Sequence, residues 1–195
     1  LGVCVGDTVI IEKAGEIIPQ VVKVTQQAGT NRESFPVPVV CPVCSGEVKK
    51  DKNGVCIRCV NPDCRAQLLE KLIYFAGKGQ MDIENLGPAL IEQLVEKGMV
   101  KNFADIYKLT FAQVSGLDRM GDKSAANVIE SIKESKKCSL ARLIAALGIS
   151  HVGGQSAEIL AEIFGGLEKL IAADEEVLQQ IDGIGPVMAK SVYDY

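Results

Sequence analysis

The stretch from Cys41 to Cys64 constrains the fold most, because it gathers five of the chain's seven cysteines into a short polar segment. Such a segment cannot bury an apolar core, so another force has to hold it together. CxxC-like spacings indicate a zinc site in a reducing compartment rather than a secreted disulfide framework. A thioredoxin-like redox pair would need a βαβ context, which the flanking sequence lacks. A site made of four cysteines has no open coordination position, so the sequence predicts a structural metal site.

The residues alone leave the ligand set open. Cys41 and Cys44 form the first pair, followed by Gly46, which we expect to permit a tight turn. The second pair could be Cys56 with Cys59, Cys59 with Cys64, or Cys56 with Cys64. Spacing favours Cys56 and Cys59. The turn-forming Asn-Pro-Asp run at 61–63 instead favours Cys64, and Val55–Arg58 has a strand-like sequence in which Cys56 would be a small hydrophobe.

The residues before this stretch are typical of β structure. Two β-branched runs, Val5–Lys13 and Ile17–Val24, flank a turn at 14–16 and predict a hairpin. Pro19 predicts an edge or an irregularity in the second strand. Two strands are marginal alone in water. The polar, proline-containing run Gln26–Pro38 is expected to be a linker.

The residues after it predict helices that recur at a fixed interval. Leu68, Leu69, Leu72 and Ile73 follow helical spacing. Four glycines then recur 34, 32 and 32 residues apart, each after an apolar residue and before an amphipathic stretch: Gly87, Gly121, Gly153 and Gly185. Regular spacing of this kind marks a repeated supersecondary unit.

In the fourth repeat, Gly183 and Gly185 allow a tight turn and close approach of another backbone, and Pro186 suits the first turn of a new helix. The free N–H groups and dipole at such a helix start favour an anion. The pattern resembles the helix–hairpin–helix motif, which implies binding to DNA phosphates without base readout.

The DNA-binding candidates are Gly87, Gly121, Lys123, Gly153, Gly154, Gln155, Gly183, Gly185 and Lys190. The alternative is that the glycines merely close helix turns and the polar side chains are solvated. The first repeat is the least typical, with Asn85-Leu86 in place of the first hairpin glycine.

Overall charge does not identify a nucleic-acid binder, because the net charge is −4. Up to Cys64 the chain has 7 Lys and Arg and 7 Asp and Glu, which leaves 14 and 18 of the totals of 21 and 25 for the remainder. DNA binding would therefore have to come from local geometry. No apolar run is long enough for a membrane span. His151, the single histidine, falls in the third hairpin, whereas Cys4 and Cys138 are expected to be inert thiols.

The order VGDTVIIEKAGEIIPQVVKV, CPVC…RCVNPDC and MDIENLG with four hairpin repeats resembles the bacterial NAD-dependent DNA ligases. The resemblance implies a mainly α fold in three parts: the end of an OB-fold and a linker (1–40), a four-cysteine zinc finger (41–64) and a helix–hairpin–helix domain (65–195). It also implies that zinc is held by Cys41, Cys44, Cys59 and Cys64, and that Cys56 is not a ligand.

The family's reaction joins a 3′-hydroxyl to a 5′-phosphate at a nick in duplex DNA, with NAD and Mg as cofactors of the full-length enzyme. Its adenylated lysine lies in a Lys-x-Asp-Gly motif that does not occur in this chain. We therefore expect a C-terminal fragment that binds duplex DNA and zinc without ligating, as a monomer, in the bacterial cytoplasm at the nucleoid. The alternatives are a non-catalytic DNA-binding or repair scaffold, and a module whose acidic helices bind proteins.

Overall fold

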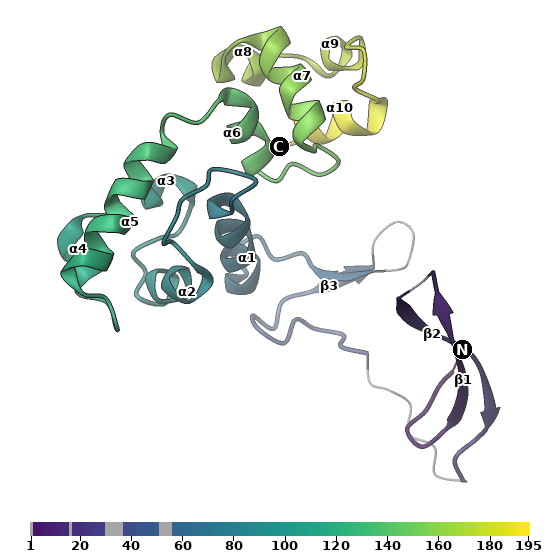
Figure 1. Cartoon of the computed structure of the whole chain (residues 1–195). Coiled ribbons are helices and arrows are strands. Elements are labelled where there is room, and N and C mark those ends of the chain that lie inside the picture. The colour runs from purple at the N-terminus through teal and green to yellow at the C-terminus, as the bar shows by residue number, and fades with distance from the viewer. Residues whose placement is uncertain (1, 16, 30–36, 51–55) are drawn as a thin grey trace. The chain divides into compact units, whose positions relative to one another are not determined.

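The computed structural model describes residues 2–15, 17–29, 37–50 and 56–195. These residues form two compact units, Leu1–Asn61 and Pro62–Tyr195. The described chain is mainly helical, with two small antiparallel sheets, as expected from the sequence (Figure 1). No helix of the described segments combines the length and apolar character needed to cross a membrane.

The predicted hairpin is present in the first unit. Strands β1 (Thr8–Ala14) and β2 (Ile18–Gln26) pair antiparallel, with Ala14 opposite Ile18, and the register shifts twice along β1. Pro19 lies opposite Lys13 in this two-stranded sheet. The linker expected at 26–38 starts one residue late, because Gln26 still belongs to β2, and its residues 30–36 lie outside the described part of the chain.

A second hairpin pairs β3 (Val48–Lys50) with β4 (Ile57–Cys59), so that Val48 lies opposite Cys59. The strand expected over 55–58 begins only at Ile57. Cys56 precedes it and is exposed, so the expectation of a small hydrophobe in a strand is wrong for this residue. Val55 lies outside the described residues.

The second unit consists of helices joined by short turns. They are α1 (Arg65–Ala76), α2 (Pro88–Glu96), α3 (Phe103–Ile106), α4 (Phe111–Ser115), α5 (Asp122–Ser135), α6 (Leu140–Ala146), α7 (Gly154–Phe164), α8 (Leu167–Ile171), α9 (Glu175–Gln179) and α10 (Pro186–Tyr193). Helices pack in four successive hairpins: α1 with α2, α4 with α5, α6 with α7, and α9 with α10. The short helices α3 and α8 lie between successive hairpins in the chain.

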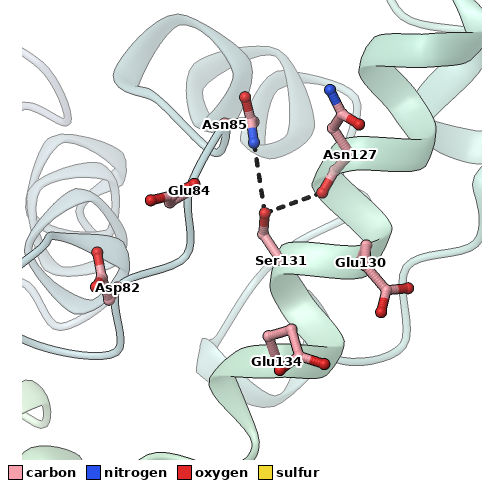
Figure 2. A pocket seen from close by; sticks show the side chains of 7 residues that line it. All are labelled: Asp82, Glu84, Asn85, Asn127, Glu130, Ser131 and Glu134. Atoms are coloured by element: carbon pink, nitrogen blue, oxygen red, sulfur yellow. Dashed lines mark hydrogen bonds between the residues drawn. The ribbon is translucent and has the colours of Figure 1, made fainter.

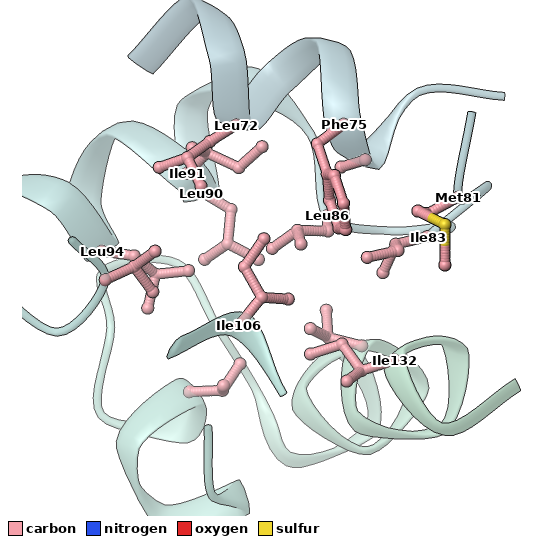
Figure 3. Packing of buried hydrophobic residues seen from close by; sticks show 14 of the residues in the cluster. Leu72, Phe75, Met81, Ile83, Leu86, Leu90, Ile91, Leu94, Ile106 and Ile132 are labelled. Atoms are coloured by element: carbon pink, nitrogen blue, oxygen red, sulfur yellow. The ribbon is translucent and has the colours of Figure 1, made fainter. Parts of the chain in front are cut away.

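Two separate hydrophobic cores stabilise this unit. The first is centred on α1, α2 and α5 and contains Leu72, Phe75, Leu94 and Ile132 (Figure 3). The second is formed by α6 to α10, with Leu160 and Leu178 at its centre. Helix α6 takes part in both, because Ala146 belongs to the first core and its neighbours Ile144 and Ala145 belong to the second.

Candidate metal centre and nucleic-acid interface

Four of the seven cysteines converge. The Sγ atoms of Cys41, Cys44, Cys59 and Cys64 all lie within 4.8 Å of one another. A tight turn brings the first two together: the N–H of Ser45 donates to Cys41 O at 2.8 Å, and the N–H of Cys41 donates to Gly46 O at 2.8 Å. The residue with left-handed backbone in this turn is Ser45, with φ of 56°, not Gly46. A Cβ at Gly46 would lie 3.1 Å from Asn61 Cβ and 3.2 Å from Cys44 Sγ, so there is little space for a side chain here.

This arrangement fits a tetrahedral metal ion. Zinc–sulfur bonds of about 2.3 Å place tetrahedral sulfurs roughly 3.8 Å apart, and Cys44 Sγ and Cys59 Sγ are 3.5 Å apart. Cys41 and Cys64 are buried, and the other two are half-buried. Hydrogen bonds from the Asn61 side chain and then from the backbone at Gly46 lower the pKa of the Cys44 thiol to about 6. A lowered pKa favours the thiolate, which is the form that binds metal.

The remaining thiols stand apart from this cluster. It is the one such group found among the described residues, and it does not include Cys56. Cys138 is half-buried, and its Sγ donates to Met81 O at 3.5 Å. Because all four donors are cysteines, a bound ion would have no open position and would act on structure rather than in a reaction. The sequence indicates Asn61 only as part of a turn, and the structure shows that it also supports Cys44.

Each of the four repeat glycines is the N-cap of the second helix of its hairpin. Gly87, Gly121, Gly153 and Gly185 precede α2, α5, α7 and α10, with extended backbone and without a side chain that caps the helix. The first N–H groups of an α-helix have no partner within the helix. Four helix starts in one unit therefore present backbone donors that no capping side chain occupies.

The turn before each N-cap is the same in all four hairpins. The residue two positions before the glycine has a left-handed backbone: Asn85 (φ 64°), Arg119 (62°), His151 (67°) and Gly183 (85°). A hydrogen bond closes the same turn each time, as from the N–H of Ile184 to Ile181 O at 3.0 Å. The first repeat is therefore not an exception, because three of the four hairpins place a non-glycine residue here. Sequence comparison of the repeats missed this because the four side chains differ.

Apolar residues on both sides of each N-cap glycine anchor the hairpin to the hydrophobic core. Four residues after the glycine, a buried side chain faces the core: Ile91, Ala125, Ala157 and Ala189. Its N–H donates to the glycine carbonyl at 2.9 to 3.0 Å, the first hydrogen bond of the helix. The apolar residue just before the glycine is buried in three hairpins and half-buried at Met120. Each helix start is thus held rigidly at the surface.

Neither conformation nor packing requires the four N-cap glycines. All four are exposed, and a Cβ placed on any of them, or on Gly154, would meet no atom within 4 Å. Their backbone is extended, which any residue can adopt. Gly183 differs, because its φ is +85° and a Cβ would lie 2.9 Å from Ile159 Cδ1.

We expect Gly183→Ala to lower the free energy of unfolding by about 1–2 kcal/mol, the cost of left-handed backbone for a residue with a Cβ. The close approach to Ile159 adds to this cost. Chemical denaturation followed by circular dichroism measures it. Gly15→Ala provides the control, since Gly15 also has positive φ but open space around it. A loss no larger at Gly183 than at Gly15 would contradict the packing argument.

The charged and polar candidates are distributed less uniformly. Lys123 and Gln155 are exposed in the first turns of α5 and α7, directly beside their glycines. Lys190 lies further along α10, and its Nζ is 3.1 Å from Asp194 Oδ2, so it is directed one turn away from the hairpin. Arg119, which no sequence pattern singled out, is exposed in the second hairpin. What places Arg119 at the tip of the hairpin turn is its left-handed backbone, and only the structure shows this conformation.

An acidic cleft borders the first hairpin. Figure 2 shows Asp82, Glu84, Glu130 and Glu134 around it, with Asn85 Nδ2 donating to Ser131 Oγ at 3.4 Å. Four carboxylates oppose the approach of a phosphate. Any nucleic acid on this unit is therefore expected to avoid the cleft and to follow the helix starts.

Comparison with known proteins assigns both halves of the second unit. Residues 81–134 match the family described as a SAM-like helix-hairpin-helix tandem, and residues 142–195 match the helix-hairpin-helix motif family. We call these the first tandem and the second tandem. The fold and the matched motifs define a helix–hairpin–helix protein, here combined with a four-cysteine cluster.

Curated relatives identify the chain more closely. It is 47% identical over 192 residues to a DNA ligase of Geobacter sulfurreducens, covering 98% of this chain and 29% of the relative. It is 49% identical over 197 residues to that of Methylacidiphilum infernorum (100% and 28%), and 46% identical over 191 residues to that of Lysinibacillus sphaericus (97% and 29%). The chain is thus a homologue of the DNA ligases along its whole length, and it spans less than a third of these relatives.

Proposed function

We propose that this chain is the duplex-binding part of an NAD-dependent DNA ligase, an enzyme that seals nicks between a 3′-hydroxyl and a 5′-phosphate. In this proposal the helix starts of both tandems hold the phosphate backbone of DNA. The four cysteines hold one zinc ion, which stabilises the local fold. NAD and Mg are cofactors of the full-length enzyme only. This chain lacks the Lys-x-Asp-Gly motif that contains the adenylated lysine.

The observation that carries this proposal is a set of four helices that each start at a glycine. No side chain caps these helix starts, and no atom lies within 4 Å of where the glycine Cβ would be. Ser, Thr, Asp and Asn cap helices better than or as well as glycine, and they occupy the free N–H groups. Glycine leaves those donors available and lets a large anion approach the backbone. A phosphate of the DNA backbone is such an anion, and backbone N–H groups at helix starts are known phosphate donors.

The charge distribution agrees with this mode of binding. The net charge of −4 gives no overall positive charge that would attract DNA from a distance. Binding must therefore rest on short contacts from neutral N–H groups, assisted by Lys123, Gln155 and Arg119 near the second and third hairpins. Contacts of this kind position a protein without reading base sequence. A ligase needs this property, because nicks occur in any sequence.

Fluorescence anisotropy with labelled duplexes tests the proposal. The zinc-loaded chain is titrated into nicked and intact duplexes, and into two duplexes of unrelated sequence, over a series of salt concentrations. We expect binding to both sequences with similar affinity. We also expect the Kd to increase as the salt concentration rises. No affinity for any duplex at low salt would exclude the duplex-binding role. A free-standing repair scaffold, the alternative, would predict a gene without an upstream Lys-x-Asp-Gly motif.

A further inference from the structure

One side chain connects the two tandems. Arg142 lies in α6, and its guanidinium reaches the loop (residues 77–87) that joins α1 to α2 in the first hairpin. Its Nε donates to Gln80 O at 2.5 Å and its Nη2 donates to Lys78 O at 2.7 Å. Its Nη2 is also 3.9 Å from Asp82 Oδ2. A residue of the second tandem thus holds the loop that enters the first.

The cores do not provide this connection by themselves. The buried residues of the two tandems form separate hydrophobic clusters, and α6 alone contributes to both. Helix α6 contacts α1 on one side and α7 on the other (Figure 1). Two smaller contacts lie nearby: Cys138 Sγ donates to Met81 O, and the Tyr74 ring packs on Gly148, where a Cβ would lie 3.7 Å from the ring. The orientation about α6 therefore depends on a small interface.

Arginine suits this task for a geometric reason. Its planar guanidinium presents several donors in a fixed arrangement, so two carbonyls held by it define a direction as well as a distance. The carbonyls of Lys78 and Gln80 are in a loop that is itself constrained, because the N–H groups of Gln80 and Asp82 both donate to Gly77 O. A rigid group on α6 thus meets a rigid loop.

We propose that Arg142 is a positioning residue that sets the orientation of the second tandem relative to the first, so that helix starts of both can contact one duplex. This inference rests on the proposed DNA-binding function but concerns the protein alone. Linking two binding modules raises the affinity for a ligand that reaches both, and this gain is lost when their geometry forbids simultaneous contact. Removal of Arg142 should therefore affect long duplexes more than short ones.

Residual dipolar couplings measured on the ¹⁵N-labelled, zinc-loaded chain test the orientation without DNA. In the unmodified protein, couplings from α2 and α5 and from α7 and α10 should fit one alignment tensor. In Arg142→Met, which keeps the apolar stem but removes the donors, two different tensors should be needed. Arg142→Lys should give an intermediate result, because lysine cannot bridge both carbonyls in a fixed plane. A single tensor in Arg142→Met would overturn the proposal.

Duplex binding provides the second measurement, with Lys137→Met as the matched control. Lys137 also carries one positive charge, but it lies between the two tandems and its Nζ pairs at 2.7 Å with Glu134, three residues earlier in the chain. Arg142→Met should reduce the preference for a long over a short duplex by about tenfold, and Lys137→Met should not. An unchanged preference in Arg142→Met would contradict the proposal. If the couplings respond as expected but no variant binds any duplex, the positioning role stands and the DNA-binding function fails.

Discussion

Cys59→Ser is expected to abolish metal binding. The purified chain should carry about one zinc ion, since four thiolates complete one tetrahedral site, and the variant should retain almost none after dialysis against a weak chelator. Cys59 Sγ lies within 4.8 Å of the three other sulfurs, so its loss leaves three ligands. Metal binding and local folding are coupled, with apparent binding free energies of about 10–16 kcal/mol for structural zinc at neutral pH. Limited proteolysis should therefore cut the β3–β4 region faster.

Cys56→Ser is the matched control for this prediction. Cys56 is exposed and does not belong to the cluster, although its spacing from Cys59 mimics a ligand pair. The variant should keep its zinc, measured by atomic absorption, and its resistance to proteolysis. Loss of zinc from Cys56→Ser, or full zinc content in Cys59→Ser, would refute this ligand set. The same experiment with Cys64→Ser tests the ligand that spacing alone does not favour.

Gly121→Asp and Gly153→Asp should weaken duplex binding while leaving the fold intact or stabilising it. Both glycines have extended backbone and open space, and aspartate is a better N-cap than glycine. A carboxylate at a helix start also interacts favourably with the helix dipole, by about 0.3–1 kcal/mol. The same carboxylate would occupy the N–H groups and repel a phosphate. Hydrogen bonds to charged groups contribute about 1.5–3 kcal/mol, so each variant should raise Kd by roughly tenfold or more.

The Asp variants are thus expected to keep or gain stability and to lose affinity for duplex DNA. This combination distinguishes a phosphate-binding role of the glycines from a purely structural one. If the glycines only served helix–helix turns, the Asp variants would lose or keep stability and would bind DNA unchanged. Gly121→Asn and Gly153→Asn separate occupation of the N–H groups from charge repulsion, because asparagine caps without a charge. Asn127→Asp is the control for charge alone: it adds the same charge on α5 at the acidic cleft, where we expect no DNA. Its Kd should change little.

Local patterns predicted much of this protein. The hairpin followed from two β-branched runs around a glycine turn, and the helices followed from the spacing of apolar residues. The four N-caps followed from glycines at regular intervals, each placed between an apolar residue and an amphipathic stretch. The convergence of Cys64 with Cys41 and Cys44 was indicated by the turn-forming run at 61–63 and implied by the family resemblance. Spacing alone favoured Cys56, because spacing ignores the direction in which the chain turns at Asn61.

The sequence by itself indicated which glycines precede helices and which cysteines are candidates to bind metal, since these depend on neighbours within a few positions. The tertiary structure decided what depends on distant segments. It showed that Asn85, Arg119, His151 and Gly183 share one backbone conformation despite their different side chains. It left open space around the N-cap glycines. It also placed Arg142 against carbonyls more than sixty residues earlier in the chain, a contact that no local pattern encodes.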